Sequence, residues 1–239
     1  DKHSLNLTAM YAQNSRGKSS PNTKEVNDLM GIKYNSYWGY QNGKKRNSRD
    51  KDVEEPLVML SHYWRLSEKT TLNTNVAFQT GSIGNSRLDY QLANNPDPTY
   101  YRNLPSYYAN QPELWNDFVY AVDGNQLFEE DGVTPQYQNL DAQNAGNYFR
   151  THSQINWDAM YFANTTSANA GRSAYVLYED RTNDNLLNAN SIINSSLSDN
   201  ITLNAGVNFR KLRSHNYQDL LDLLGGQYFL DVDAFYTGD

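Results

Sequence analysis

Five segments of this chain alternate apolar and polar residues with a period of two, and no other feature constrains the fold as strongly. In the clearest segment, 70–80, apolar side chains fall on one face, and asparagine, threonine and glutamine fall on the other. Such alternation is the signal of a half-buried β-strand. The five segments are 4–11, 58–66, 70–80, 187–197 and 201–210. The sequence therefore predicts an all-β, antiparallel fold.

The connections between these segments are of two kinds. Residues 67–69 and 198–200 form very tight turns, whereas the connections 14–54, 86–185 and 215 onward are long. Because the two kinds alternate along the chain, every long loop is expected to leave from the same end of the sheet. The stretch 66–73 also matches 197–204, so one strand–turn–strand hairpin is used twice, which favours an array of hairpins.

Short helices are expected within the long loops. Residues 112–120 read as a helix with Pro112 in its first turn, and 153–162 as another. A third is predicted from Asn216 as the capping residue through Leu224, where two glycines would stop it.

The polar face of the strands distinguishes this sheet from an ordinary soluble one. It is rich in asparagine and threonine with few charges, as in a wet lumen, whereas a solvent face usually carries lysine and glutamate. Eleven residues at about 3.3 Å each, tilted near 45°, cover about 25 Å, the height of an outer-membrane apolar band. These features predict an up-and-down transmembrane β-barrel segment of about five strands, with long extracellular loops carrying short helices.

The barrel interpretation assigns each strand residue to a side. The predicted lipid-facing residues are Leu72, Val76, Phe78, Leu203, Val207 and Phe209. The predicted lumen-facing residues are Asn73, Asn75, Asn204 and Asn208.

Charge and residue usage exclude several classes of function. The net charge is −7, with no long basic stripe, which argues against nucleic acid as a partner. The absence of cysteine excludes a thiolate metal site, and the four histidines are scattered without metal-ligand spacing. The oxygen-rich cluster at 123–131 matches no EF-hand loop and is interpreted as a solvated acidic turn. No catalytic motif is present, so no enzyme activity, metal or cofactor is expected.

Five sequence blocks carry a resemblance to a known family. They lie at 100–108, 154–159, 175–181, 200–206 and 223–233; the first reads Tyr-Tyr-Arg-Asn-Leu-Pro-Ser-Tyr-Tyr. The chain resembles the β-barrel of TonB-dependent outer-membrane receptors, of the large type that carries a carboxypeptidase-regulatory-like domain before its plug, SusC-like relatives included. Large barrels of this kind have 22 strands. The coupling box, the plug and the closing strand are not found in this sequence. Residues 1–239 are therefore expected to be part of such a barrel domain, and both ends look cut from something longer.

The resemblance implies a function and a location. It implies import of a bulky nutrient, a siderophore, oligosaccharide or peptide, across the outer membrane of a Gram-negative bacterium. The implied partners are outer-membrane lipid, the TonB complex acting through the missing plug, and a surface lipoprotein. Two alternatives stay open: an asparagine-rich secreted or surface β-protein acting as a binding or adhesion module, and a hydrolytic outer-membrane barrel.

Aromatic residues in the longest loop are the candidates for ligand binding, because aromatic rings combine large area with a polar tip. The alternative is that these rings pack loop helices onto the barrel rim. The candidate residues are Tyr100, Tyr101, Tyr107, Tyr108 and Trp115.

Overall fold

Two compact units make up the chain in the computed structural model, which describes residues 1–90, 93–166 and 171–232. The first unit contains 1–17, 50–87 and 177–221. The second contains 18–49, 88–176 and the described residues from 222 onward. Each unit is thus assembled from three separate stretches of sequence.

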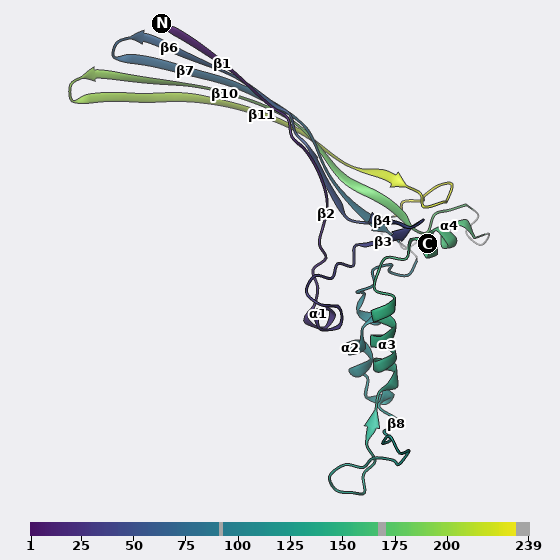
Figure 1. Cartoon of the computed structure of the whole chain (residues 1–239). Helices are drawn as coiled ribbons and strands as arrows, with labels where there is room; N and C mark the ends of the chain where they lie inside the picture. The colour runs from purple at the N-terminus through teal and green to yellow at the C-terminus, as the bar shows by residue number, and fades with distance from the viewer. Residues whose placement is uncertain (91–92, 167–170, 233–239) are drawn as a thin grey trace. The chain divides into compact units, whose positions relative to one another are not determined.

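A seven-stranded sheet forms the first unit (Figure 1). Five of its strands follow one another in the order β1-β6-β7-β10-β11, while β2 pairs with β5 and β5 also pairs with β7. The strands are β1 (His3–Met10), β2 (Gln13–Gly17), β5 (Asp50–Glu54), β6 (Leu57–Ser67), β7 (Thr70–Asp89), β10 (Val176–Ser198) and β11 (Ile201–Asp222). The prediction of five period-two strands and of a predominantly antiparallel β-fold is confirmed.

The two predicted tight turns are also present. Ser67 pairs with Thr70 across the turn between β6 and β7, and residues 199–200 alone separate β10 from β11. Several strands are longer than predicted, since β10 has 23 residues and β11 has 22. The period-two pattern fades in these extensions because both of their faces carry polar residues.

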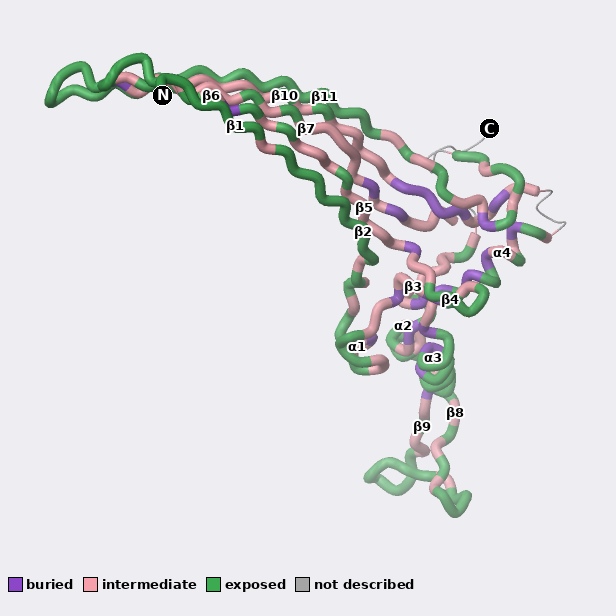
Figure 2. The backbone as a smooth tube through the Cα atoms, turned by 45° about the horizontal axis from the view of Figure 1, so that its top comes forward, coloured by how far each residue is buried: buried purple, intermediate pink, exposed green. Residues whose placement is uncertain are grey.

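Strand register places the apolar side chains on a common face. Leu7 lies opposite Leu60, and Leu60 lies opposite Val76, so one row runs across β1, β6 and β7. A side-chain hydrogen bond between Thr74 and Ser191, and one that Thr80 donates to Asn185, continue the register onto β10. The apolar face is largely open to the surroundings of this unit, and Figure 2 shows exposed residues along most of β1 and β11.

Gly81 marks the point where β7 changes its partner. Before it, Gln79 pairs with Leu57 of β6; after it, Ser82 pairs with Glu54 of β5. Gly81 has φ +151°, and a Cβ atom there would lie 1.9 Å from the Glu54 carbonyl oxygen. A residue with a side chain therefore cannot occupy this position without moving β5.

The second unit combines short helices with two small hairpins. Its first hairpin pairs β3 with β4, and its second pairs β8 with β9. The elements are α1 (Lys24–Met30), β3 (Trp38–Gln41), β4 (Lys44–Asn47), the 3₁₀ helices η1 (Tyr101–Asn103) and η2 (Pro112–Leu114), α2 (Pro105–Ala109), β8 (Asp117–Phe118), β9 (Tyr137–Gln138), α3 (Leu140–Thr151) and α4 (Trp157–Thr165).

A small apolar core joins α1, α3 and the residue before α2. Val26, Leu104 and Phe149 are each at most 4% exposed, and Tyr34 packs edge-to-face on Phe149. Polar caps fix where the helices start. The side chains of Thr23, Asn139 and Asn156 each accept a hydrogen bond from a backbone N–H in the first turn of the helix that follows.

The helix predictions were only partly correct. The helix predicted at 153–162 begins instead at Trp157, because Asn156 caps it. The predicted helix at 112–120 is wrong beyond η2, since Asp117 and Phe118 pair with β9. The predicted helix from Asn216 to Leu224 is wrong, because that stretch continues β11 and pairs with β10 through bonds such as Thr182 to Asn216.

Asn164 connects three separate stretches of the second unit. Its amide nitrogen donates to the carbonyl oxygens of Tyr175, Leu223 and Leu224, and its amide oxygen accepts from the backbone N–H groups of Ala174 and Tyr175. The residue is 1% exposed. One buried side chain thus forms hydrogen bonds with five backbone groups that lie outside the helices and strands.

Candidate functional site

Four of the five predicted ligand-binding residues form one row of tyrosines. The ring of Tyr101 makes edge-to-face contacts with those of Tyr100 and Tyr107, at centroid distances of 4.7 and 5.5 Å. Tyr107 in turn contacts Tyr108 at 5.2 Å. Edge-to-face geometry is the preferred arrangement for aromatic pairs, so the four rings support one another.

The elements beneath the tyrosine row hold it in place. Leu104, between η1 and α2, is buried in the core of the second unit. The backbone N–H and hydroxyl of Ser106 both donate to the Glu25 carboxylate at 2.7 Å, and the Asn139 side chain donates to the Tyr108 carbonyl at 2.9 Å. The row therefore lies on a fixed scaffold made by α1, α2 and the start of α3.

Arg102 gives the tyrosine row a positive edge. Its Nε donates to the Tyr101 hydroxyl at 3.0 Å, and this hydrogen bond lowers the pKa of Tyr101. The pKa of Tyr100 is raised, chiefly by its hydrogen bond with Tyr101. Rings, phenol groups and a guanidinium in one place suit a flat or sugar-like ligand with acidic or hydroxyl groups.

Trp115 lies apart from the row. Its indole N–H donates to the Ala109 carbonyl at 3.1 Å, and the ring is 48% exposed. Among the described residues it makes no ring contact with the four tyrosines. It follows α2 into the hairpin of β8 and β9, where Phe118 stacks near Tyr137.

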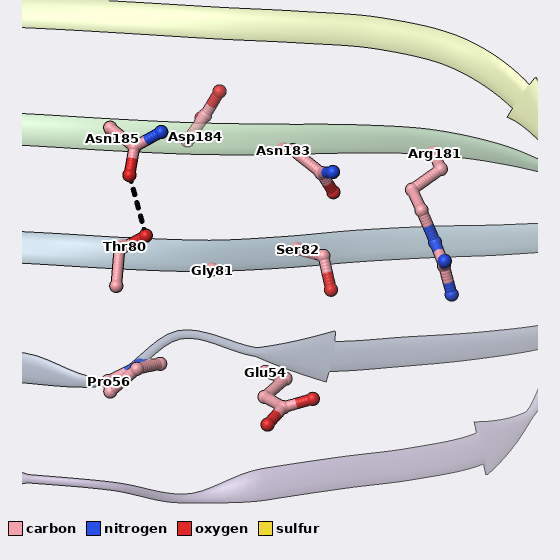
Figure 3. A pocket seen from close by; sticks show the side chains of 9 residues that line it. All are labelled: Glu54, Pro56, Thr80, Gly81, Ser82, Arg181, Asn183, Asp184 and Asn185. Atoms are coloured by element: carbon pink, nitrogen blue, oxygen red, sulfur yellow. Dashed lines mark hydrogen bonds between the residues drawn. The ribbon is translucent and has the colours of Figure 1, made fainter.

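A polar groove of about 460 Å³ opens on the sheet of the first unit, next to Gly81 (Figure 3). Side chains of β7 and β10 face each other across it, and Thr80 donates to Asn185 at 2.6 Å. The lining residues are Glu54, Pro56, Thr80, Gly81, Ser82, Arg181, Asn183, Asp184 and Asn185. Such a groove offers hydrogen-bond donors and acceptors but no aromatic surface.

Arg181 in this groove is already neutralised. Its Nε lies 2.9 Å from Glu179, which is 2% exposed, and its Nη1 donates to Asp219 at 3.2 Å. The buried Glu179 carboxylate is thus paired with a cation, which offsets the free-energy cost of removing its charge from water.

A second cavity, of about 390 Å³, lies between the residues before η1 and the end of α3 in the second unit. His152 and Tyr148 stack on its wall with their rings 4.0 Å apart and nearly parallel. Asn95 and Asp97, in the segment before η1, also line this cavity. The four histidines show no metal-ligand spacing in the sequence, and the stacked geometry gives His152 a packing partner.

The acidic cluster at 123–131 folds as two tight turns. Asp123 accepts from the backbone and side chain of Asn125, while Asp131 accepts from the backbone of Val133 and Thr134. These hydrogen bonds lower the pKa of both carboxyls. Within the described residues, no group of three or more acidic or histidine side chains is placed to hold a metal ion.

Sequence reasoning found the tyrosines but missed both the groove and Arg102. The tyrosines stand out because they are clustered in sequence. The groove is formed by residues more than 100 positions apart, and only the register of β7 with β10 brings them together.

No described helix is long and apolar enough to span a membrane. Neither a protein-family model, nor a curated protein sequence, nor a solved structure matches the chain.

Proposed function

We propose that this chain is part of the wall and outer loops of a TonB-dependent outer-membrane barrel that imports a bulky nutrient. The exposed apolar face of the first unit is the observation that carries the proposal. Leu7 of β1 is 71% exposed and lies in a row with Leu60 and Val76, and Val207 on the apolar face of β11 is 73% exposed. An exposed apolar surface of this kind is typical of a face that is buried against another molecule, and in this proposal it is buried against lipid.

The opposite face supports a wet lumen. Asn75 of β7 donates to Asn190 of β10 at 2.9 Å, and Asn73 and Asn204 carry the same kind of side chain. Amide side chains that bond to one another across strands suit a hydrated interior better than a packed core. Tight turns at one end of the strands and long loops at the other agree with short periplasmic turns and long external loops.

In this proposal the tyrosine row contributes to the external binding surface. The import energy comes from the TonB complex through a plug that is not part of these residues, as the family resemblance implies. The candidate ligands are siderophores, oligosaccharides and peptides. No described residue is assigned chemistry on the ligand.

A second candidate is an asparagine-rich surface or secreted β-protein that binds other molecules. The exposed apolar face then packs on a second protein layer rather than on lipid. The tyrosine row favours this candidate to the same degree, because it suits any binding protein.

Cell fractionation separates the two candidates. Full-length protein carrying this chain is expected in the outer-membrane fraction, resistant to carbonate and salt washes and released only by detergent. Release into the aqueous fraction without detergent would contradict the barrel proposal and favour the secreted binding protein.

A further inference from the structure

Basic side chains continue the apolar face of β11 beyond Phe209. Leu203, Val207 and Phe209 share one face of the strand, and the same alternation carries Lys211 and Arg213. His215 follows on that face, and its ring lies 5.0 Å from that of Tyr217. Lys211, Arg213 and His215 are all exposed. One strand face thus changes from apolar to basic within two residues.

The neighbouring strand completes a polar recess beside these cations. Asn183, Asn185, Arg213, Ser214 and His215 line a cavity of about 410 Å³. Asn183 and Asn185 also line the groove in Figure 3, so the two hollows adjoin on the same sheet. Amide, hydroxyl, guanidinium and imidazole groups are all suited to a phosphate oxygen.

Nearby carboxylates do not neutralise the basic row. Asp219 and Glu179 are engaged with Arg181, and Asp180 pairs with Arg87 at 3.2 Å. Over the described ranges, Lys211 and Arg213 have no carboxylate within ion-pair distance. No carboxylate of the described chain lines the cavity itself. The ionisable groups that line the recess itself are therefore basic, while the carboxylates of Glu54 and Asp184 line the adjoining groove.

Apolar side chains lie directly next to the recess. Val207 and Phe209 share the face of β11 that carries Lys211 and Arg213, and Phe209 lies two residues before Lys211. Val207 and Phe209 are 73% and 57% exposed. A ligand that spans this boundary needs a negatively charged head and an apolar tail.

We propose that Lys211, Arg213 and His215, with Asn183 and Asn185, bind the phosphate of a membrane lipid whose acyl chain lies along Val207 and Phe209. The proposal rests on the membrane location proposed above, because that location puts lipid against this face. A lipid fits better than free phosphate because exposed apolar side chains lie next to the exposed cations. An acyl chain can bury these side chains, whereas free phosphate cannot.

Phosphatidic acid, which has a phosphate monoester head, is the probe for the test. The full chain in neutral detergent micelles is mixed with phosphatidic acid, and bound lipid is counted by native mass spectrometry. The double variant Lys211→Gln/Arg213→Gln is expected to bind about thirtyfold more weakly, at about fivefold per charge. The matched control is Arg210→Gln, which removes a cation from the opposite face of the same strand and is expected to keep full binding.

Three outcomes overturn the inference. In the first, Arg210→Gln and the double variant lose phosphatidic acid binding equally, and in the second neither variant loses it. In the third, inorganic phosphate at the same concentration as the lipid displaces the lipid from the protein. The first indicates nonspecific charge attraction, and the third a simple anion site without a role for the acyl chain.

Failure of this inference is distinguishable from failure of the proposed function. Protein that fractionates to the outer membrane yet binds phosphatidic acid independently of Lys211 and Arg213 refutes the lipid site alone. Protein that is released into water without detergent refutes the membrane location, whatever its binding to micellar lipid.

Discussion

At the scale of single residues, a few polar side chains hold the second unit together. Asn164 satisfies five backbone groups, and Arg46 joins β4 to the end of β11 through Asp222 at 2.6 Å. Arg46 also lies over the ring of Trp157, with its guanidinium 4.3 Å from the ring centre. The two contacts of Arg46 link positions more than 100 residues apart, so sequence alone gives no sign of them.

Asp222 predicts a pH dependence of stability. Burial alone would raise its pKa, but hydrogen bonds from Arg46, Leu224 N–H and Tyr161 outweigh burial and lower it. Because the folded pKa lies below the unfolded value, the stabilisation is present above about pH 4 and is lost as pH falls through the folded pKa. Asp222→Asn is expected to lower the free energy of unfolding by about 1 kcal/mol at pH 7.

The measurement is chemical unfolding in detergent at a series of pH values from 7 to 3. The difference in free energy of unfolding between wild type and Asp222→Asn is expected to become smaller toward pH 3. Glu130→Gln, at an exposed glutamate, is the control. A gap that stays constant across this range would show that the carboxylate charge does not contribute.

The tyrosine row predicts a loss of ligand affinity without unfolding. Burying one aromatic ring against a ligand is worth about 1–3 kcal/mol, which corresponds to about 5- to 100-fold in affinity. The variant Tyr101→Ala/Tyr107→Ala removes two rings and is therefore expected to weaken binding by at least that factor. Binding is measured against a panel of ferric chelates, oligosaccharides and peptides, with Trp115→Ala as the comparison. Unchanged affinity in the tyrosine variant means that these rings only pack α2.

At the scale of elements, the two faces of β11 make opposite predictions. Val207 is on the apolar face, so Val207→Arg is expected to cost about 2–4 kcal/mol if it lies near the bilayer midplane. Asn208, one residue on, points to the polar face, and Asn208→Arg is expected to be tolerated. Urea unfolding of both variants in lipid bilayers measures the difference. A larger cost for Asn208→Arg would reverse the assignment of lipid and lumen.

The elements that the sequence predicted well are those with a local signal. Period-two segments become β1, β6, β7, β10 and β11, and the repeated hairpin supplies both tight turns. The predicted helix from Asn216 failed because pairing with β10 overrides the local preference of a leucine-rich stretch. Helix α3 was missed because its apolar positions are few and only Phe149 and Gly146 are buried.

The regions predicted as loops contain ordered structure for a similar reason. Residues 14–54 hold α1 and four short strands, none longer than five residues. Strands this short have no room for a clear alternation. Their positions depend on partners such as β7, which lies about 30 residues further along the chain.

At the scale of the whole molecule, the two kinds of connection predict a topology across the membrane. If the chain is a barrel wall, the turn at Glu68 and Lys69 is periplasmic, and the turn at Gly124 in the longest loop is extracellular. A short epitope inserted at Gly124 is expected to be labelled by antibody on intact cells, whereas one at Lys69 requires permeabilised cells. Both turns are exposed, so insertion disturbs little packing. Labelling at Lys69 on intact cells would invert the topology.

The described sheet has two outer edges, and these have a consequence for any sample of this chain studied by itself. β1 pairs only with β6 and β11 only with β10 among the described strands, which leaves a row of backbone N–H and C=O groups along each. Unpaired edges template the addition of further strands. The β1 edge of one copy and the β11 edge of another are different surfaces, so pairing between them is heterologous. Each added copy again leaves one β1 edge and one β11 edge unpaired, so further copies can add without the assembly closing into a ring. The isolated chain in water is therefore expected to grow into ribbons or filaments, and a monodisperse preparation needs a neighbouring strand, or a detergent, to occupy those edges.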